Sequence, residues 1–436
     1  MPSLIDFWKR NPSVGVLAVL SLVAIPVGLV WTAARVFLPV VTGEMPFITD
    51  FSFYYDGVER FLRGEPLYPD PFFGYMYPPP SVVLFLPLLA LPVPASFLAS
   101  VVGIAVLAVV CIDLTIRIWE EGWGERVGAP FRVSLLLIGF ATAPVFHNLK
   151  YGQVNVLVLA IGLGFLWLLR RDRPLAAALL LSVGFWLKLY PIALALLGLR
   201  RGWVKSGTLG LLVGIVGVPL VLLPVLPAEL YRQYAFELVP YWSTVTNMHA
   251  LNQSITGVLE HVQLPITDYL RSHDTPIGAL AQSVNTAAAV VLFGGFYAGY
   301  FLRRLRLDVV GVAVLATLPV VSGLGWEHTY VLALPLYLYV LLEAQRRGAA
   351  ARWLAAFAVF VFLIPKPPEE VMRWTFEHWP RAAVDVFYAR FLVVTLVLLG
   401  VAAVWLWRRR PADTERAPAA GPPGRAHREA IARATR

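Results

Sequence analysis

The amino-acid sequence predicts an all-α polytopic membrane protein. Of its 436 residues, 58% are hydrophobic and only 14% are charged, and the mean hydropathy is +0.69. A water-soluble protein of this length would carry more charge, so a soluble fold is excluded. Much of the excess positive charge lies in short clusters at the ends of apolar runs, such as Lys9–Arg10, Arg170–Arg171 and Arg200–Arg201. Such clusters orient membrane spans by the positive-inside rule and do not indicate nucleic-acid binding.

The first apolar run extends from Val14 to about Leu38 and follows a basic start, as the core of a signal peptide would. It is longer than such a core, and many further apolar runs follow it, so we predict a retained membrane anchor. The single cysteine, Cys111, lies inside a later apolar run. Because a disulfide needs two cysteines and a cysteine-based metal site needs several, a single cysteine excludes an intramolecular disulfide and a cysteine-based metal site.

The first apolar run carries the chain to the external side, so the loop that follows it is external. Four apolar runs, at roughly 81–93, 95–118, 133–147 and 153–169, lie between this loop and the basic cluster at Arg170. A return to the cytoplasmic side needs an odd number of crossings. The run 81–93 has about 13 residues, which reach about 20 Å as a helix, against a hydrocarbon core of about 30 Å. We therefore predict that this run does not span the membrane.

The next run, Leu175 to Leu199, lies between two basic clusters that both belong on the cytoplasmic side. One helix would place its two ends on opposite sides of the membrane. The tetrapeptide Lys188-Leu-Tyr-Pro191 interrupts this run, and proline breaks a helix. Broken helices are tolerated where they line a cavity, so we predict two shorter helices that turn near Lys188–Pro191.

After Lys205 the basic clusters separate the apolar runs into pairs, and an even number of crossings keeps every intervening loop external. The pairs lie at roughly 206–226 and 279–302, at 309–325 and 330–343, and between Arg352 and Arg408. In all, we expect one transmembrane domain over residues 1–410, with about 10–13 spanning helices, external loops and interfacial helices. Residues 411–436 are rich in Ala, Pro and Arg and are predicted to form a disordered cytoplasmic tail.

The stretch from Pro46 to Pro80 is too polar for lipid and too aromatic for a solvated tail. Carboxylates among aromatic side chains at a bilayer surface are costly unless they are paired or used, so we predict a working loop of a membrane enzyme at about 40–80. Asp50 is a candidate general base for a sugar hydroxyl. It is equally a candidate N-cap for the segment that follows it, whose polar and apolar spacing suits an interfacial helix.

Polar residues at other span ends are further candidates. Lys188 lies in an apolar run, where a cation faces a cavity or a partner; a phosphate group and a structural ion pair are the two alternatives. His328 is a candidate for proton transfer or phosphate binding, or an interfacial anchor. Gln153 and Asn155 can hydrogen-bond a sugar or join two helices. The sequence contains no Asp-x-Asp near the loop and no Walker A, Gly-x-Ser-x-Gly or His-Glu-x-x-His motif, so neither a metal nor a nucleotide sugar is indicated.

Several of these residues form an ordered set of motifs. The set contains Asp50-Phe-Ser-Phe-Tyr-Tyr, Gly64-Glu-Pro-Leu-Tyr68, Tyr77-Pro-Pro-Pro80, Tyr151-Gly-Gln-Val-Asn155, Lys188-Leu-Tyr-Pro191, Asn252-Gln-Ser-Ile255 and Trp326-Glu-His-Thr-Tyr330. It resembles the polyprenyl-phosphate-mannose-dependent mannosyltransferases of glycosyltransferase family 87. The resemblance runs from about Asp50 to Pro335, and the first loop is its most specific part.

The resemblance implies a GT-C architecture with its active site on the external face of the plasma membrane and its C-terminus in the cytoplasm. It implies inverting transfer of a hexose, with mannose expected, from a polyprenyl phosphate to a glycolipid or glycan of the cell envelope, without a metal or other cofactor. Asp50 matches the family's base, and His328 is the second catalytic candidate. The candidates for binding the donor or substrate are Tyr54, Tyr55, Arg60, Tyr68, Tyr77, Gln153, Asn155, Lys188, Tyr190, Asn252, Gln253 and Glu327.

A transporter or flippase of lipid-linked sugars is the main alternative, because it would also bury polar residues and bind a phosphate. Transporters are often built from repeated halves, and no repeat is visible in this sequence. An interaction scaffold for an envelope complex is a third class, but it leaves Lys188 and Asp50 unexplained.

Overall fold

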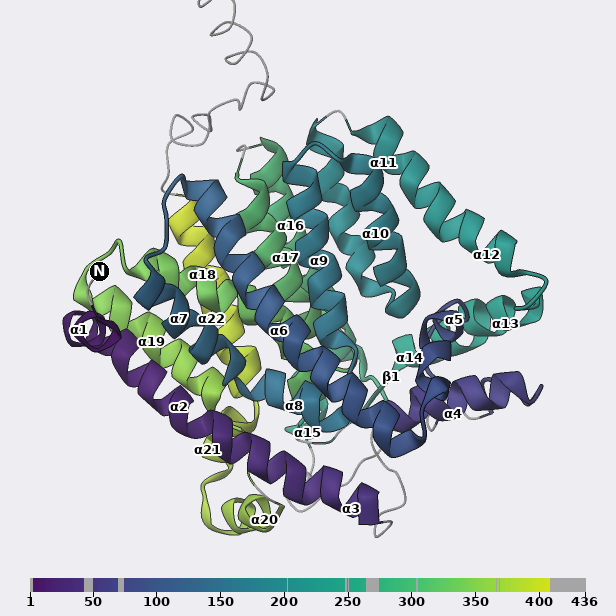
Figure 1. The fold of residues 1–436 in the computed structure, drawn as a ribbon, viewed down its shortest axis with the longest axis horizontal. Helices are drawn as coiled ribbons and strands as arrows, with labels where there is room; N and C mark the ends of the chain where they lie inside the picture. Colours follow the sequence, from purple (N-terminus) through teal and green to yellow (C-terminus); the bar gives the residue numbers. More distant parts are fainter. Residues whose placement is uncertain are drawn as a thin grey trace, which may run out of the picture.

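The computed structural model describes residues 3–42, 50–69, 74–201, 203–247, 249, 251–263, 274–302, 305–365, 367 and 369–407. Within these ranges the chain is almost entirely helical, as predicted (Figure 1). Four helices are long and apolar enough to cross a membrane, or up to six if each bent pair counts as one span. The predicted tail at 411–436 and the basic residues Arg303, Arg304 and Arg409 lie outside the described residues.

The first apolar run forms a longer helix than the sequence indicates. After α1 (Leu4–Arg10), the helix α2 (Pro12–Thr32) continues through a π-helical turn, η1 (Ala33–Phe37), into α3 (Leu38–Thr42). Together α2, η1 and α3 form an unbroken helix of 31 residues. At 1.5 Å per residue this is about 46 Å, which is longer than the hydrocarbon core of a bilayer.

The predicted interfacial helix of the first loop is present as α4 (Asp50–Leu62). Its buried residues Phe51, Tyr54 and Val58 recur at intervals of three and four, which gives the helix one apolar face. That face packs on α5 (Ser81–Phe85) and η2 (Leu86–Ala90). Figure 1 shows α4 lying across the end of the bundle rather than along it.

The next helices alternate between the two ends of the bundle. They are α6 (Val93–Trp123), α7 (Ala129–Phe140), α8 (Ala143–Tyr151), α9 (Asn155–Arg170), α10 (Pro174–Leu187) and the 3₁₀ helix η3 (Tyr190–Arg201). Helices α7 and α8 form one path bent by 52°. Residues 81–92 contain only the short helices α5 and η2, as the sequence predicts for the run 81–93. Helix α6 then starts beside α4, where the ring centres of Phe51 and Phe97 lie 5.4 Å apart.

The predicted break near Lys188 is also confirmed. Helix α10 ends at Leu187, Lys188 is extended, and η3 leads back to the end at which α10 began. The hydrogen bond from Trp203 Nε1 to Asp172 Oδ1, at 3.0 Å, joins the two outer ends of this hairpin. The hydroxyl of Tyr300, on a later helix, donates a hydrogen bond to the carbonyl of Leu197 in η3. This bond supplements the internal hydrogen bonds of η3, whose geometry is poorer in a 3₁₀ helix than in an α-helix.

The second half repeats this pattern of paired helices. It contains α11 (Val204–Leu211), η4 (Leu212–Gly217), α12 (Val218–Leu222), α13 (Ala228–Gln233), η5 (Tyr234–Leu238), α14 (Val239–Thr244), β1 (Val245–Asn247), α15 (Ile255–His261), β2 (Asp274–Pro276), α16 (Ala279–Leu302), α17 (Leu307–Val321), η7 (Glu327–Ala333), α18 (Leu334–Ala344), α19 (Ala349–Leu363), α20 (Glu369–His378), α21 (Arg381–Tyr388) and α22 (Arg390–Trp407). Strands β1 and β2 form a short antiparallel ribbon with Thr246 opposite Thr275.

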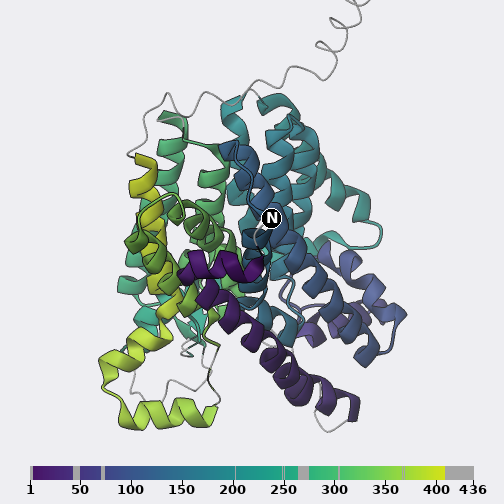
Figure 2. The same ribbon diagram turned by 60° about the vertical axis from the view of Figure 1, so that its left-hand side comes forward.

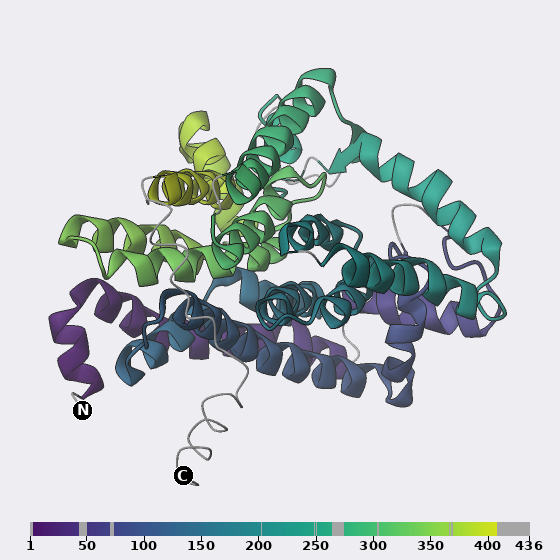
Figure 3. The same ribbon diagram turned by 90° about the horizontal axis from the view of Figure 1, so that it is seen from above.

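Helices α17 and α18 form the centre of the core, because almost every residue in both is buried. The views in Figures 2 and 3 show other helices packed around them, with the N-terminal helices in purple along one side. The teal segment around α12 projects from the bundle, and its Leu220 and Val221 are exposed, as expected for side chains that face lipid.

Ion pairs join the helix ends at one end of the bundle, which we call the basic end. Arg170 lies 3.5 Å from Asp308, Arg171 lies 2.9 Å from Glu121, and Arg346 pairs with Glu125. Figure 1 places α11 at this end and α4, α15 and α20 at the opposite end. The predicted basic clusters that the structure describes therefore lie opposite the first loop.

Candidate active site

Asp50 is the first residue of α4, and its carboxylate accepts a hydrogen bond from Nε2 of Gln153. A carboxylate in the first turn of a helix is favoured by the helix dipole, so the helix-start role and a chemical role are compatible here. Burial raises the pKa of Asp50, while the bond from Gln153 and the charge of Lys188 oppose that rise. A carboxyl with a raised pKa is a stronger base once it has lost its proton.

Gln153 reaches Asp50 because α8 ends in a tight turn. Gly152 has a φ of +63°, in the left-handed region that glycine adopts without strain. A side chain at this position would also meet Phe51, since an added Cβ would lie 2.8 Å from the Cβ of that residue. The turn therefore brings α4 close to the start of α9. Gln153 Oε1 in turn accepts from the hydroxyl of Tyr54 at 3.1 Å.

Lys188 occupies the break between α10 and η3, and its ammonium faces Asn155 and two tyrosine rings. Nζ donates to Oδ1 of Asn155 at 2.7 Å and lies 5.8 Å from the ring centre of Tyr77 and 5.9 Å from that of Tyr190. Tyr190 also donates to Asn155 Oδ1, at 3.2 Å. Within the described part of the chain, no carboxylate lies within ion-pair distance of Lys188.

Six of the predicted residues therefore join Asp50 in one polar cluster: Tyr54, Tyr77, Gln153, Asn155, Lys188 and Tyr190. Its members come from α4, the first loop, the α8–α9 turn and the α10–η3 break. We call this the Asp50–Lys188 cluster. It contains a carboxylate, an ammonium group, amides and phenols, which can together accept a proton, bind a phosphate and hydrogen-bond a sugar.

Glu327 is the centre of a second group of polar residues. Its Oε1 accepts from Arg390 Nη2 at 2.8 Å and from Gln253 Nε2 at 3.1 Å, and its Oε2 lies 2.9 Å from Nδ1 of His147. All four side chains are buried. These three neighbours fix the orientation of the Glu327 carboxylate. We call Glu327, Arg390, Gln253 and His147 the Glu327 cluster.

His328 lies between the two clusters. Its carbonyl accepts a hydrogen bond from Asn148 Nδ2 at 2.7 Å, and its ring centre lies 6.2 Å from that of Tyr151. The ring centre of Tyr151 lies in turn 6.1 Å from that of His147. The α8–α9 turn therefore connects both clusters at the same end of the bundle.

Asn252 is fully buried, and its hydrogen bonds join two loops. Its amide donates to the carbonyls of Asn247 and Gly323, at 2.9 and 3.2 Å, and its Oδ1 accepts from the amide of Gly325 at 2.8 Å. Gln253 continues this contact by donating its backbone amide to Gly325. These bonds fix the loop that carries Glu327.

Three further predicted residues, Tyr55, Arg60 and Tyr68, lie outside both the Asp50–Lys188 cluster and the Glu327 cluster. Tyr68 donates to the carbonyl of Tyr77 at 2.7 Å and so supports the first loop. Tyr55 donates to the carbonyl of Leu91 at 3.3 Å. Arg60 is in the last turn of α4, about 15 Å along the helix from Asp50.

His147 and Arg390 are site residues that the sequence reasoning missed. Arg390 could have been found by the argument used for Lys188, since it is a cation at the start of an apolar helix of 18 residues. His147 is the last residue of the predicted apolar run 133–147, and a polar side chain there is expected to face a partner rather than lipid. Their common partner Glu327 is more than 60 residues from Arg390 and 180 from His147 in sequence, so no local pattern indicates the pairing.

The chain is 27% identical over 414 residues to a polyprenol-phosphate-mannose-dependent alpha-(1-2)-phosphatidylinositol mannoside mannosyltransferase of Mycobacterium tuberculosis, which covers 86% of this chain and 90% of the relative. The protein of the same description from Mycolicibacterium smegmatis is 24% identical over 360 residues, 76% of each chain. The model of glycosyltransferase family 87 matches residues 75–324, which include Lys188 but not Asp50. This match covers more than half of the sequence, and the chain therefore belongs to glycosyltransferase family 87.

Proposed function

We propose that this membrane glycosyltransferase moves mannose from a polyprenyl phosphate to a glycolipid of the cell envelope and inverts the anomeric configuration. The observation that carries the proposal is the Asp50–Lys188 cluster, in which a half-buried carboxylate and a half-buried ammonium group are held in one hydrogen-bonded arrangement. The two relatives, which are described as using polyprenol-phosphate-mannose, support the choice of donor.

In the proposed reaction, Asp50 removes the proton of the acceptor hydroxyl as its oxygen attacks the anomeric carbon. The bond between that carbon and the phosphate oxygen breaks, and both electrons leave with the polyprenyl phosphate. Lys188 stabilises the negative charge of the departing phosphate, and the proton remains on Asp50 until it passes to solvent. Attack and departure take place on opposite faces of the sugar, which accounts for inversion.

This reaction needs neither a nucleotide nor a metal, because the lipid phosphate is itself the leaving group. His328 and Glu327 lie beside the Asp50–Lys188 cluster and are proposed to contact the substrates. Tyr54, Tyr77 and Tyr190 offer rings and hydroxyls that suit a pyranose ring.

The acceptor is proposed to be a glycolipid because two amphipathic helices, α4 and α20, lie at the same end of the bundle (Figure 1). Helices of this kind lie in the interface plane of a bilayer, where a glycolipid head group is found. The two relatives are described as acting on phosphatidylinositol mannoside, which is the natural first compound to test. By the positive-inside rule, the basic end is cytoplasmic and the Asp50–Lys188 cluster faces the external side.

Turnover by the purified full-length chain tests the proposal. We expect transfer from polyprenyl-phosphate mannose to phosphatidylinositol mannoside, slower transfer from polyprenyl-phosphate glucose and no transfer from a nucleotide sugar. NMR of the product should show the anomeric configuration opposite to that of the donor. Movement of intact lipid-linked mannose across proteoliposome membranes, without any product, would instead support the flippase alternative.

A further inference from the structure

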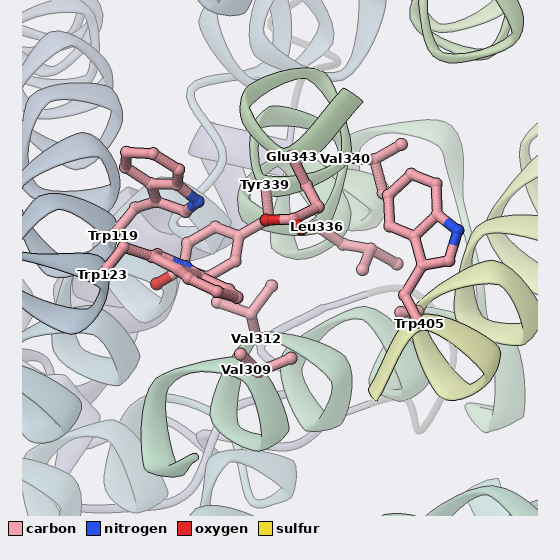
Figure 4. Close-up of a pocket in the computed structure, with 10 residues that line it drawn as sticks. Trp119, Trp123, Val309, Val312, Leu336, Tyr339, Val340, Glu343 and Trp405 are labelled. Carbon is pink, nitrogen blue, oxygen red and sulfur yellow. The ribbon is translucent and has the colours of Figure 1, made fainter. Parts of the chain in front are cut away.

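The described residues form a pocket at the basic end, remote from the Asp50–Lys188 cluster. Helices α6, α17, α18 and α22 surround it (Figure 4). Its lining includes three tryptophans, Trp119, Trp123 and Trp405, with aliphatic side chains such as Val309 and Val312 below them. The pocket is small and open at its mouth, which suits a short segment of one hydrocarbon chain rather than a whole lipid.

Arginine side chains cover the tryptophans of this pocket. The guanidinium carbon of Arg347 lies 4.2 Å from the ring centre of Trp405, and that of Arg346 lies 4.7 Å from the ring centre of Trp123. Glu343 pairs with both arginines, but at 3.8 and 3.6 Å and with both arginine side chains about one-third exposed. Arg346 also pairs with Glu125, whereas the pair of Arg347 with Glu343 is weak, so Arg347 can still bind an anion.

Two buried donors beside the pocket have no hydrogen-bond partner among the described residues. One is Nε1 of Trp119, whose side chain is 4% exposed, and Figure 4 shows this nitrogen turned toward the interior of the pocket. The other is Nε of Arg347. Buried donors are normally paired, so these two indicate a ligand that supplies acceptor oxygens.

We propose that this pocket binds a membrane glycerophospholipid, and this inference goes beyond the proposed transfer reaction. One acyl chain lies between Trp119 and Trp405, an ester carbonyl accepts from Trp119 Nε1, and the phosphate pairs with Arg347. Tryptophan rings suit the boundary between acyl chains and head groups. Guanidinium groups match phosphate oxygens in charge and geometry, and basic pockets between helices on the cytoplasmic side bind lipid head groups.

Native mass spectrometry of the delipidated full-length chain, titrated with phosphatidylglycerol, tests the proposal. Ala402→Trp places a large ring in the pocket and should abolish the first binding event. The matched control is Val290→Trp on α16, where the side chain is 67% exposed to lipid, and it should bind like the wild type. Equal binding by the two variants would overturn the proposal.

Two milder variants keep the test decisive if Ala402→Trp perturbs folding. Trp119→Phe removes the indole donor and keeps the ring, and Arg347→Gln removes the charge. Because a hydrogen bond to a charged group contributes substantially to binding, we expect about a tenfold higher phosphatidylglycerol concentration for half-saturation in Arg347→Gln. Glycosyl transfer in excess lipid should be unchanged in both variants. Wild-type affinity in both would show that neither group contacts the lipid and would refute the site.

Discussion

Asp50 and Lys188 lie at the two ends of one hydrogen-bonded chain that runs through Gln153 and Asn155. Gln153 Nε2 donates to Asp50, Asn155 Nδ2 donates to Gln153 Oε1 at 3.4 Å, and Lys188 Nζ donates to Asn155 Oδ1 at 2.7 Å. The two amides therefore hold the carboxylate and the ammonium group apart in a fixed relation. Such a separation suits a base and a leaving-group site on opposite faces of a sugar.

Asp50→Asn should abolish measurable transfer and leave the fold and the donor affinity intact. The amide cannot accept the acceptor's proton, and loss of a positioned base typically lowers a rate by about 10²–10⁴. Single-turnover kinetics with bound donor measure the effect. The control is Asp56→Asn on the same helix, where the residue is exposed and should lose much less activity. Near-normal turnover in Asp50→Asn would remove Asp50 as the base and make Glu327 or His328 the next residue to test.

Lys188→Met should weaken donor binding by tenfold or more, because it removes a charge-assisted hydrogen bond to phosphate worth about 1.5–3 kcal/mol. The midpoint of thermal unfolding should change little, since Lys188 forms no ion pair within the described residues. Lys205→Met, at an exposed position of the basic end, is the control. If Lys188→Met lowers the unfolding midpoint and leaves the donor affinity unchanged, its role is structural.

The rate of transfer should fall at acidic pH, and the fall should begin at a higher pH than an ordinary aspartate would give. Burial raises the pKa of Asp50, and the base acts only when it is deprotonated. The bond from Gln153 lowers that pKa, so Gln153→Met should move the acid limb of the pH–rate profile to still higher pH. An acid limb that does not move in Gln153→Met would show that another group controls it.

Arg390→Met should destabilise the fold by about 3–5 kcal/mol, the usual cost of leaving a buried charge without its partner. Arg390 and Glu327 are both buried and lie 2.8 Å apart. The double variant Arg390→Met/Glu327→Gln should recover part of the loss, because it removes the stranded carboxylate. Arg117→Met is the control, since Arg117 pairs with Asp113 at an exposed position. Thermal unfolding in detergent measures all three, and equal midpoints for Arg390→Met and Arg117→Met would contradict the expectation.

Cysteine labelling in intact cells should place Asp50 and the basic end on opposite sides of the membrane. Glu65→Cys and Gln263→Cys should react with an impermeant thiol reagent, whereas Arg126→Cys and Arg173→Cys should react only after permeabilisation. Cys111 is buried, so the native background should be low. Labelling divided between the two sets would refute the topology and the proposed external site together.

The sequence predicts the all-α membrane class and two local features of the chain, because the signals for them are local. The hydropathy of each run, its length and the nearest basic cluster were enough to predict the hairpin at Lys188–Pro191 and the short segment before α6. The ordered motifs were enough to identify the family, which the family model confirms. The hydropathy, the length and the basic flanks of a run depend only on residues within about one helix length, and each motif is likewise a short segment.

Only the tertiary structure decided which polar residues meet. Gln153 is 103 residues from its partner Asp50, and Gln253 is 74 residues from Glu327. His147 and Arg390 are recognised as site residues because both contact the carboxylate of Glu327. The sequence by itself determined the class and the family of this protein and the break at Lys188–Pro191, because these signals lie in short segments of the chain. The partners of Asp50, Lys188 and Glu327 were decided by helix packing, because a hydrogen bond needs its two atoms within about 3 Å, whatever their separation along the chain.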